Sequence, residues 1–128
     1  DIGGAGALQG RKFAPGTTEY GEAFETYLAH ELRAYSEYVS GDSVHFWRSS
    51  AGHEVDFILG DHTAVEVKAK RTVGPQDLKS LLALSEENTL KDYLCVSLES
   101  RRRTIGKLQI LPYAEFLDGL WDGRFTSR

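Results

Sequence analysis

Two segments with the patterning of β-strands, residues 53–59 and 63–71, are separated by only three residues, Gly60, Asp61 and His62. A third strand-like segment, residues 43–49, precedes them across a connection that is equally short. Three residues are enough to join antiparallel neighbours, whereas a parallel crossover needs a dozen or more. The sequence therefore predicts a three-stranded antiparallel meander.

Helical periodicity flanks this meander. Residues 18–39 form an amphipathic pattern that Thr17 or Thr18 can cap and Gly41 can end, and residues 75–87 form a second one. Strands are expected near residues 93–98 and 104–111, and a last helix near 113–121. The side chains expected to face inward are Phe24, Tyr27, Leu28, Leu32, Tyr35, Tyr38 and Val39 in the first helix and Leu78, Leu81, Leu82 and Leu84 in the second.

This order of elements predicts an α/β layer fold: N-terminal helix, antiparallel meander, crossover helix, further strands and C-terminal helix. The helix between the third and fourth strands allows a right-handed crossover that makes these two strands parallel. The chain has 128 residues, of which 41% are hydrophobic and 27% charged, as in one ordinary globular domain. Residues 1–18 are rich in glycine and are expected to be a linker or lead-in, which leaves residues 19–128 as the domain.

Cellular context is constrained by what the composition lacks. We find no apolar run of about 18 residues and no targeting pattern, so membrane and secretory interpretations are excluded. The single cysteine, Cys95, fits a cytoplasmic protein. The chain contains no methionine, which indicates a piece of a longer protein.

Acidic side chains dominate the chemistry of the two adjacent strands. Side chains alternate between faces along a strand, so Glu66 and Lys68 share one face. If the loop has three residues, Leu59 pairs with Thr63 and Asp56 stands across from Glu66 on the same face. A two-residue loop would place the two acids on opposite faces.

Two opposed carboxylates repel each other unless positive charge lies between them. Lys68 supplies one charge, whereas Mg²⁺ (or Mn²⁺) would supply two and prefers the oxygen ligands present: Asp56, Glu66, the Val67 carbonyl and water. Such a metal polarises a phosphoryl oxygen and lowers the pKa of bound water, with Lys68 orienting the water or a phosphate. The alternative is a solvated cross-strand ion pair, but apolar neighbours place both acids on interior strands.

An upstream acid completes a known pattern. Gly21 and Glu25 have the spacing G-x-x-x-E on the first helix, Asp56 follows, and Glu66-Val67-Lys68 closes the series. This arrangement resembles the PD-(D/E)XK nuclease superfamily, although Val55 stands where a proline is common. The resemblance implies a restriction-endonuclease-like core, with Glu25, Asp56 and Glu66 as metal ligands and Lys68 beside them.

A closer resemblance spans nearly the whole chain. It rests on Phe24-Glu25, Glu31-Leu32, Phe46-Trp47-Arg48, Gly52 with Glu54-Val55-Asp56-Phe57, Glu66-Val67-Lys68-Ala69, Leu111-Pro112, Phe116-Leu117 and Leu120-Trp121. These segments resemble the uncharacterised nuclease-like domain at the C-terminal end of bacterial and archaeal AAA-type ATPases. The resemblance implies an ATPase domain on the N-terminal side as a partner.

The charge balance argues against simple DNA binding. The formal net charge is −4, so contact with a polyanion requires local basic clusters or bound cations. Weak candidates for nucleic-acid contact are Arg48, Lys70, Lys79, Arg101 and Arg102. Each has a structural alternative: Arg48 can neutralise Glu31, and residues 101–103 can form a solvated turn between the last two strands.

Other polar residues fit structural roles better. Glu31 lies inside the apolar arc of the first helix and is either an additional ligand or a structural acid bonded to Arg48, Trp47 or a backbone amide; we favour the structural role. The four histidines lack the spacing of zinc ligands and suit surface or packing positions. We expect Trp47 and Trp121 to pack in the core or against a partner.

Two functional hypotheses follow. The first is a Mg²⁺-dependent nuclease that acts on DNA, or alternatively on RNA, as the C-terminal domain of a larger ATPase. The second is a catalytically silent accessory domain that retains the nuclease fold for nucleic-acid binding or assembly. The complete set Glu25, Asp56, Glu66 and Lys68 favours the first, whereas the acidic composition favours the second. Both hypotheses leave a homodimer open.

Overall fold

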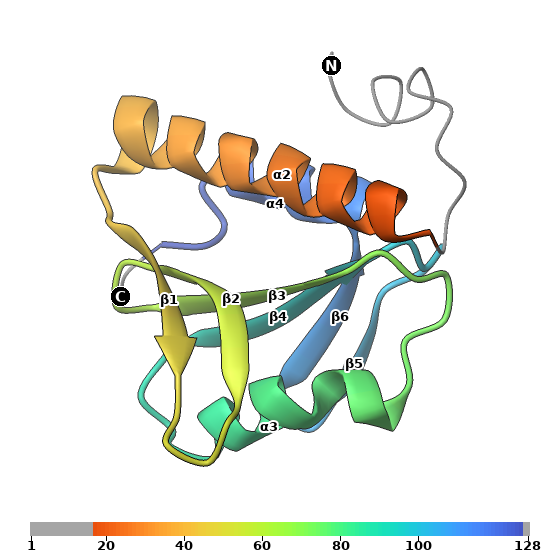
Figure 1. The fold of residues 1–128 in the computed structure, drawn as a ribbon. Coiled ribbons are helices and arrows are strands. Elements are labelled where there is room, and N and C mark those ends of the chain that lie inside the picture. The colour runs from red at the N-terminus through yellow and green to blue at the C-terminus, as the bar shows by residue number, and fades with distance from the viewer. Residues whose placement is uncertain (1–16, 127–128) are drawn as a thin grey trace.

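The computed structural model describes residues 17–126, so almost all of the expected lead-in lies outside the described part of the chain. The fold is a mixed α/β arrangement around a six-stranded sheet in the order β1-β2-β3-β4-β6-β5 (Figure 1). The elements are α2 (Thr18–Tyr35), the π-helical turn η1 (Ser36–Ser40), β1 (Val44–Arg48), β2 (Glu54–Leu59), β3 (Thr63–Lys68), the 3₁₀ turn η2 (Pro75–Leu78), α3 (Lys79–Ser85), β4 (Asp92–Ser97), β5 (Arg103–Ile105), β6 (Leu108–Pro112) and α4 (Tyr113–Trp121).

Strand pairing confirms the predicted meander and crossover. β1, β2 and β3 pair antiparallel, whereas β3 with β4 and β4 with β6 pair parallel. β5 adds an antiparallel edge strand beside β6. Because η2 and α3 connect β3 to β4, this crossover is the element that makes the centre of the sheet parallel.

Helices cover both faces of the sheet. α2 and α4 lie on one face and α3 lies on the other (Figure 1). The face under α2 and α4 packs a core around Phe24, Leu28, Leu32, Leu94 and Phe116, all fully buried. The α3 face packs a second core that includes Leu81, Tyr93, Cys95 and Ile110.

Helix α2 begins where the sequence predicts and changes geometry before its expected end. The Thr17 side chain accepts a hydrogen bond from the Tyr20 N–H at 3.1 Å and caps the first turn. The last turn widens into η1, and Gly41 ends it in the left-handed region at φ 75°. Tyr38 and Val39, expected to face inward, are exposed, because this turn extends beyond the core under α2.

Two further expectations are corrected on the C-terminal side. The second helix is a 3₁₀ turn followed by two turns of α-helix, and Leu82 is exposed rather than inward. The segment expected as one strand over residues 104–111 is a hairpin of β5 and β6 that reverses at Gly106, whose φ is 58°. Residues 101 and 102 therefore precede β5, and Arg103 begins it.

Candidate functional site

The β2–β3 hairpin has the register that the three-residue loop predicts. Leu59 pairs with Thr63 and Phe57 pairs with Val65, which brings Asp56 beside Glu66 at the next position. His62, the last residue of the loop, is buried. Its ring contacts the Asp42 carboxylate at 2.9 Å and the Thr63 hydroxyl at 2.7 Å. The loop that sets the register is therefore anchored by polar contacts of its own.

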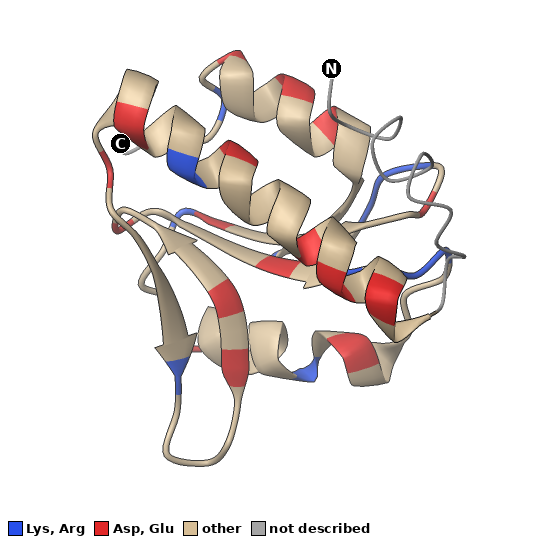
Figure 2. Cartoon of the chain, turned by 45° about the horizontal axis from the view of Figure 1, so that its top comes forward, with Lys and Arg blue, Asp and Glu red and all other residues tan. Residues whose placement is uncertain are grey.

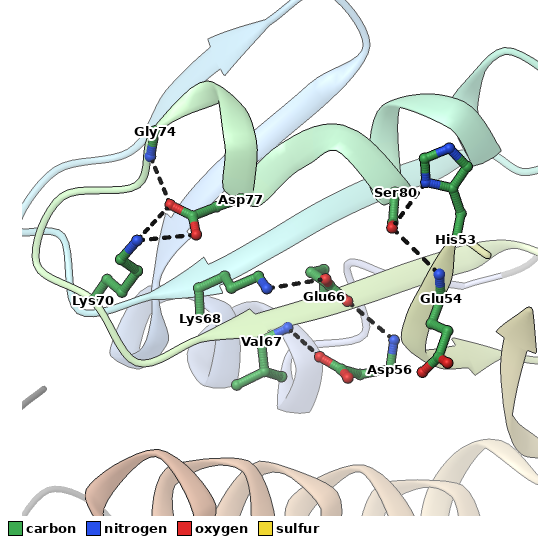
Figure 3. Close-up of polar contacts among 10 residues, drawn as sticks. All are labelled: His53, Glu54, Asp56, Glu66, Val67, Lys68, Lys70, Gly74, Asp77 and Ser80. Atoms are coloured by element: carbon green, nitrogen blue, oxygen red, sulfur yellow. Dashed lines mark hydrogen bonds and ion pairs between the residues drawn. The ribbon is translucent and has the colours of Figure 1, made fainter. Parts of the chain in front are cut away.

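Beyond the pairing of Phe57 with Val65, the hydrogen bonds between β2 and β3 are made by carboxylate side chains and backbone N–H groups. The Asp56 N–H donates to Glu66 Oε1 at 3.1 Å, and the Val67 N–H donates to Asp56 Oδ2 at 2.8 Å (Figure 3). Each carboxylate thus accepts a backbone N–H from the opposite strand. The N–H of Val67 takes part in this arrangement. The role of its carbonyl as a metal ligand stays a prediction.

A β-bulge modifies the predicted geometry at Asp56. His45 pairs with Ile58 and Trp47 pairs with Val55, so one residue of β1 opposes two residues of β2. Val55 and Ile58 both pack into the core on the α3 face, which strict alternation would forbid. The regular alternation of β2 is thus interrupted next to Asp56, whereas the β2–β3 register is the predicted one. Two reciprocal hydrogen bonds between backbone N–H groups and carboxylates connect the two strands at the acids.

Glu66 is the buried member of the group, with 6% of its surface exposed. Burial, and next the charge of Asp56, raise the pKa of Glu66 to about 8. Lys68 opposes this shift, with its Nζ 3.6 Å from Glu66 Oε2. On the next strand Glu66 is in register with Cys95, and burial raises the pKa of that thiol to about 12. Glu66 therefore sits in an environment that opposes its charge.

Helix α2 brings Glu25 to the same place. The pKa of Glu25 is raised, first by partial burial and then by the charge of Asp56 and a hydrogen bond between the two side chains. The positive charge of Lys68 opposes this shift. Asp56 therefore interacts with a carboxylate on each side, one from α2 and one from β3. We call this group, Glu25, Asp56, Glu66 and Lys68, the acidic site.

The donors of the acidic site fit a hard divalent cation in type and charge. Three carboxylates share one lysine, and oxygen donors are those that Mg²⁺ prefers. Within residues 17–126, however, no three His, Cys, Asp or Glu side chains form a group assembled to hold a metal ion. The structure therefore supplies suitable ligands without a closed coordination cage.

Sequence reasoning missed Asp77, which lies beyond Lys68. Its carboxylate accepts two hydrogen bonds from Lys70 Nζ, at 3.0 and 2.9 Å, and one from the Gly74 N–H at 2.9 Å (Figure 3). Burial works against the charge, but the bonds from Gly74 and Lys70, together with Lys68, hold the pKa of Asp77 below its usual range. The sequence does contain a signal for this contact, because Asp77 lies three residues after Gly74, which precedes the helix start, and an acid at this spacing can accept the N–H of the capping residue. Lys70, a candidate for nucleic-acid contact, is thus engaged by Asp77.

Two expected contacts of the basic and aromatic residues are corrected. Arg48 pairs with Glu54 at 3.4 Å on the surface and leaves Glu31 to another partner. Glu31 Oε1 accepts a hydrogen bond from Trp121 Nε1 at 2.9 Å, which confirms a structural acid but with a different donor. Trp121 also packs edge-on against Tyr35 with 43% of its surface exposed, whereas Trp47 packs half-buried against the core on the α3 face.

The remaining basic candidates lie at the start of α3 and on the loop before β5. Lys79 is exposed at the start of α3. Arg101 and Arg102 line a cavity of about 400 Å³ together with Arg71, Arg103 and Glu99. We call this cavity the arginine pocket.

The fold and the site define a mixed α/β domain in which a helix acid and two strand acids gather around one lysine. The family model described as Domain of unknown function (DUF4143) matches residues 20–116, and the chain belongs to this family. Comparisons with curated proteins and with solved structures find no match. None of the helices in the described part of the chain is long and apolar enough to cross a membrane.

Proposed function

We propose that this domain is a Mg²⁺-dependent nuclease that hydrolyses phosphodiester bonds of DNA. The observation that carries the proposal is the convergence of the acidic site: Asp56 and Glu66 are held by reciprocal hydrogen bonds, and the charges of Asp56 and Lys68 act on both Glu25 and Glu66. A purely structural cluster would not be expected to keep three carboxylates beside one cation. Strongly perturbed carboxylates in one cluster are typical of functional sites.

Each residue of the acidic site has a role in this proposal. Asp56 and Glu66 supply metal ligands from neighbouring strands, and Glu25 supplies a third from α2. When bound, the metal would polarise a phosphoryl oxygen and make its water more acidic. Lys68 Nζ, at the edge of the group, orients the water or a non-bridging phosphate oxygen, and the Val67 carbonyl adds a backbone ligand.

The sequence patterns point in the same direction. The order Glu25, Asp56 and Glu66-Val67-Lys68 resembles the PD-(D/E)XK superfamily, and the helix and sheet order is compatible with a restriction-endonuclease-like core. The longer resemblance to the C-terminal domain of AAA-type ATPases leads us to propose an ATPase domain as the partner within a longer chain. We also propose that the protein acts in the cytoplasm.

A second function is favoured by two specific observations. The acidic site lacks a closed ligand group among the described residues, and the chain carries a net charge of −4. Both observations suit an accessory domain that keeps the nuclease fold for nucleic-acid binding or assembly and does not cleave.

Calorimetric titration of Mg²⁺ and Mn²⁺ into wild type, Asp56→Ala and Glu25→Gln separates these alternatives. Glu37→Gln is the matched control, since it removes an exposed acid from η1, about three turns beyond Glu25. The proposal predicts weaker metal binding for both site variants and none of this loss for the control. The same proteins are then assayed for cleavage of duplex, single-stranded and branched DNA and of RNA.

Three outcomes are decisive. Loss of both metal binding and DNA cleavage in Asp56→Ala supports the nuclease. Metal binding that survives Asp56→Ala contradicts the proposed site. Metal and nucleic-acid binding by wild type without cleavage of any of these substrates favours the accessory domain.

A further inference from the structure

The arginine pocket lies where the two central parallel strands leave the sheet. β3 ends at Lys68 and continues through Arg71, while β4 ends at Ser97 and continues through Arg101 to β5. The pocket has a volume of about 400 Å³ and is lined by four arginines and one glutamate.

Hydrogen bonds hold the two loops of the pocket together. The Leu98 N–H donates to the Lys70 carbonyl at 3.0 Å, and the Val73 N–H donates to Glu99 Oε2 at 2.7 Å. Arg103 Nη2 donates to the Val73 carbonyl at 2.7 Å. The pocket is therefore built by the fold from loops about 30 residues apart in sequence, as the separation of Val73 and Arg103 shows.

The positive charge of the pocket is only partly balanced. Glu99 is neutralised by Arg103, whose Nε lies 2.9 Å from Oε1, and this contact holds the pKa of Glu99 below its usual range. Arg102 pairs with Glu115 at 3.3 Å on the surface, where such pairs are weak. Arg71 and Arg101 have no acidic partner within residues 17–126.

Guanidinium groups in this arrangement match a phosphate. Each presents a planar fork of N–H donors that can hold two phosphate oxygens at once and keeps its charge at all accessible pH values. Glu99 is committed to Arg103 and the Val73 N–H, so it leaves Arg71 and Arg101 available to an anion.

The pocket lies close to the acidic site along the chain. Arg71 follows Lys68 by three residues, which a fully extended chain spans in at most roughly 10 Å. The first half of α2, which lies at the same end of the molecule as these loops, carries Glu19 and Glu22 as well as Glu25 (Figure 2). A polyanion that reaches the acidic site needs positive charge to offset these acids, and the arginine loops supply it.

We propose that the arginine pocket binds a backbone phosphate of the nucleic-acid strand whose phosphodiester bond reaches the acidic site. The proposal rests on the proposed function and adds to it the direction in which the strand runs, from Lys68 toward Arg71 and Arg101. It also gives a chain with a net charge of −4 a local source of affinity for DNA.

The test compares Arg71→Ala/Arg101→Ala with Arg33→Ala/Lys91→Ala. Both double variants remove two exposed positive charges, but Arg33 lies in the last turn of α2 and Lys91 precedes β4, at the opposite end of that strand from the pocket. Binding of a short fluorescein-labelled DNA duplex and of its single strand is followed by anisotropy in EDTA over a range of salt concentrations. Thermal unfolding confirms that all variants are folded.

We expect the pocket variant to bind roughly tenfold more weakly and to lose about one unit of the slope of log K against log salt, as for one phosphate contact. The control should stay within about twofold of wild type. An unchanged affinity and slope in the pocket variant, or an equal loss in the control, overturns the proposal. So does a wild-type protein that binds neither DNA.

Cleavage in Mg²⁺ separates this proposal from the proposed function. If wild type cleaves DNA and the pocket variant binds and cleaves as well, the pocket proposal fails and the nuclease stands. If the pocket variant alone loses affinity and no protein cleaves, phosphate binding in the pocket stands and the nuclease fails.

Discussion

The backbone N–H of Asp56 donates a hydrogen bond to the Glu66 carboxylate at 3.1 Å, although the two side chains repel each other. Asp56 in turn accepts the N–H of Val67 at 2.8 Å, so the backbone fixes both acids in place. These bonds compensate only part of the cost of two adjacent carboxylates, one of them buried. The site therefore retains an affinity for positive charge, which Lys68 meets in part through its contact with Glu66.

Asp56→Asn should separate structural from functional roles. Asparagine keeps an acceptor for the Val67 N–H and removes the charge that raises the pKa of Glu66 and Glu25. We expect metal affinity and DNA cleavage to fall at least by the 10- to 100-fold that loss of an outer-shell partner costs. The unfolding temperature should stay equal or rise. Calorimetry, a cleavage assay and thermal unfolding measure the three effects.

Asp56→Ala is the comparison, because it removes the acceptor as well as the charge and should also be less stable than Asp56→Asn. An Asp56→Asn protein that is destabilised but binds metal and cleaves as wild type would show that Asp56 is only a structural acceptor.

Stability should decrease as the pH rises through the range in which Glu66 titrates. Its pKa is raised from 4.5 to about 8, so the folded state holds a proton that the unfolded state has already released. The resulting stabilisation is complete below about pH 4.5 and is lost as the pH approaches 8. Urea unfolding between these limits should show a decrease on the order of a few kcal/mol that Glu66→Gln lacks.

Mg²⁺ provides an independent check on the same group. Near pH 8, added Mg²⁺ should restore stability to wild type, because it binds the ionised Glu66 of the folded state. The Glu66→Gln protein should respond less. Equal pH dependence in the two proteins would mean that Glu66 titrates near its ordinary pKa.

Local sequence determined those parts of the fold that depend on short-range geometry. Three residues between β2 and β3 were enough to predict the pairing of Leu59 with Thr63, and the connection through α3 was enough to predict the parallel β3 and β4. The acids of the site could be identified for the same reason, since their strand register follows from one loop.

Features that depend on distant partners could not be predicted. The bulge at Asp56 arises from the pairing of β2 with β1, and no local pattern specifies it. Glu31 bonds to Trp121, 90 residues away, where the sequence suggested Arg48. The arginine pocket likewise exists only because the fold joins two loops, although Arg101 and Arg102 were visible as a basic run.

Trp121→Phe should test the contact between α2 and α4 without affecting the acidic site. The change removes the hydrogen bond to Glu31 and keeps an aromatic ring beside Tyr35. We expect a loss of about 1 kcal/mol in the free energy of unfolding, measured in urea, because the bond is partly exposed. DNA binding, metal binding and cleavage should be unchanged. Glu31→Gln keeps an acceptor and should be nearly neutral.

Lys68→Met should separate metal binding from catalysis. Methionine retains the unbranched apolar stem and removes the ammonium group that lies 3.6 Å from Glu66 and lowers the pKa of that carboxyl. Because the metal ligands remain, we expect calorimetric Mg²⁺ binding to persist above pH 8, where Glu66 is ionised. Cleavage should fall by about 10²- to 10⁴-fold, the range for a positioned proton-transfer group.

Lys70→Met is the matched control, since Lys70 lies two residues further along and bonds to Asp77 instead. Its loss should lower stability slightly and leave cleavage within a few-fold of wild type. If the two methionine variants cleave equally well, the ammonium group of Lys68 has no part in the reaction. If Lys68→Met instead abolishes Mg²⁺ binding, the lysine supports the metal ligands and does not act on the substrate.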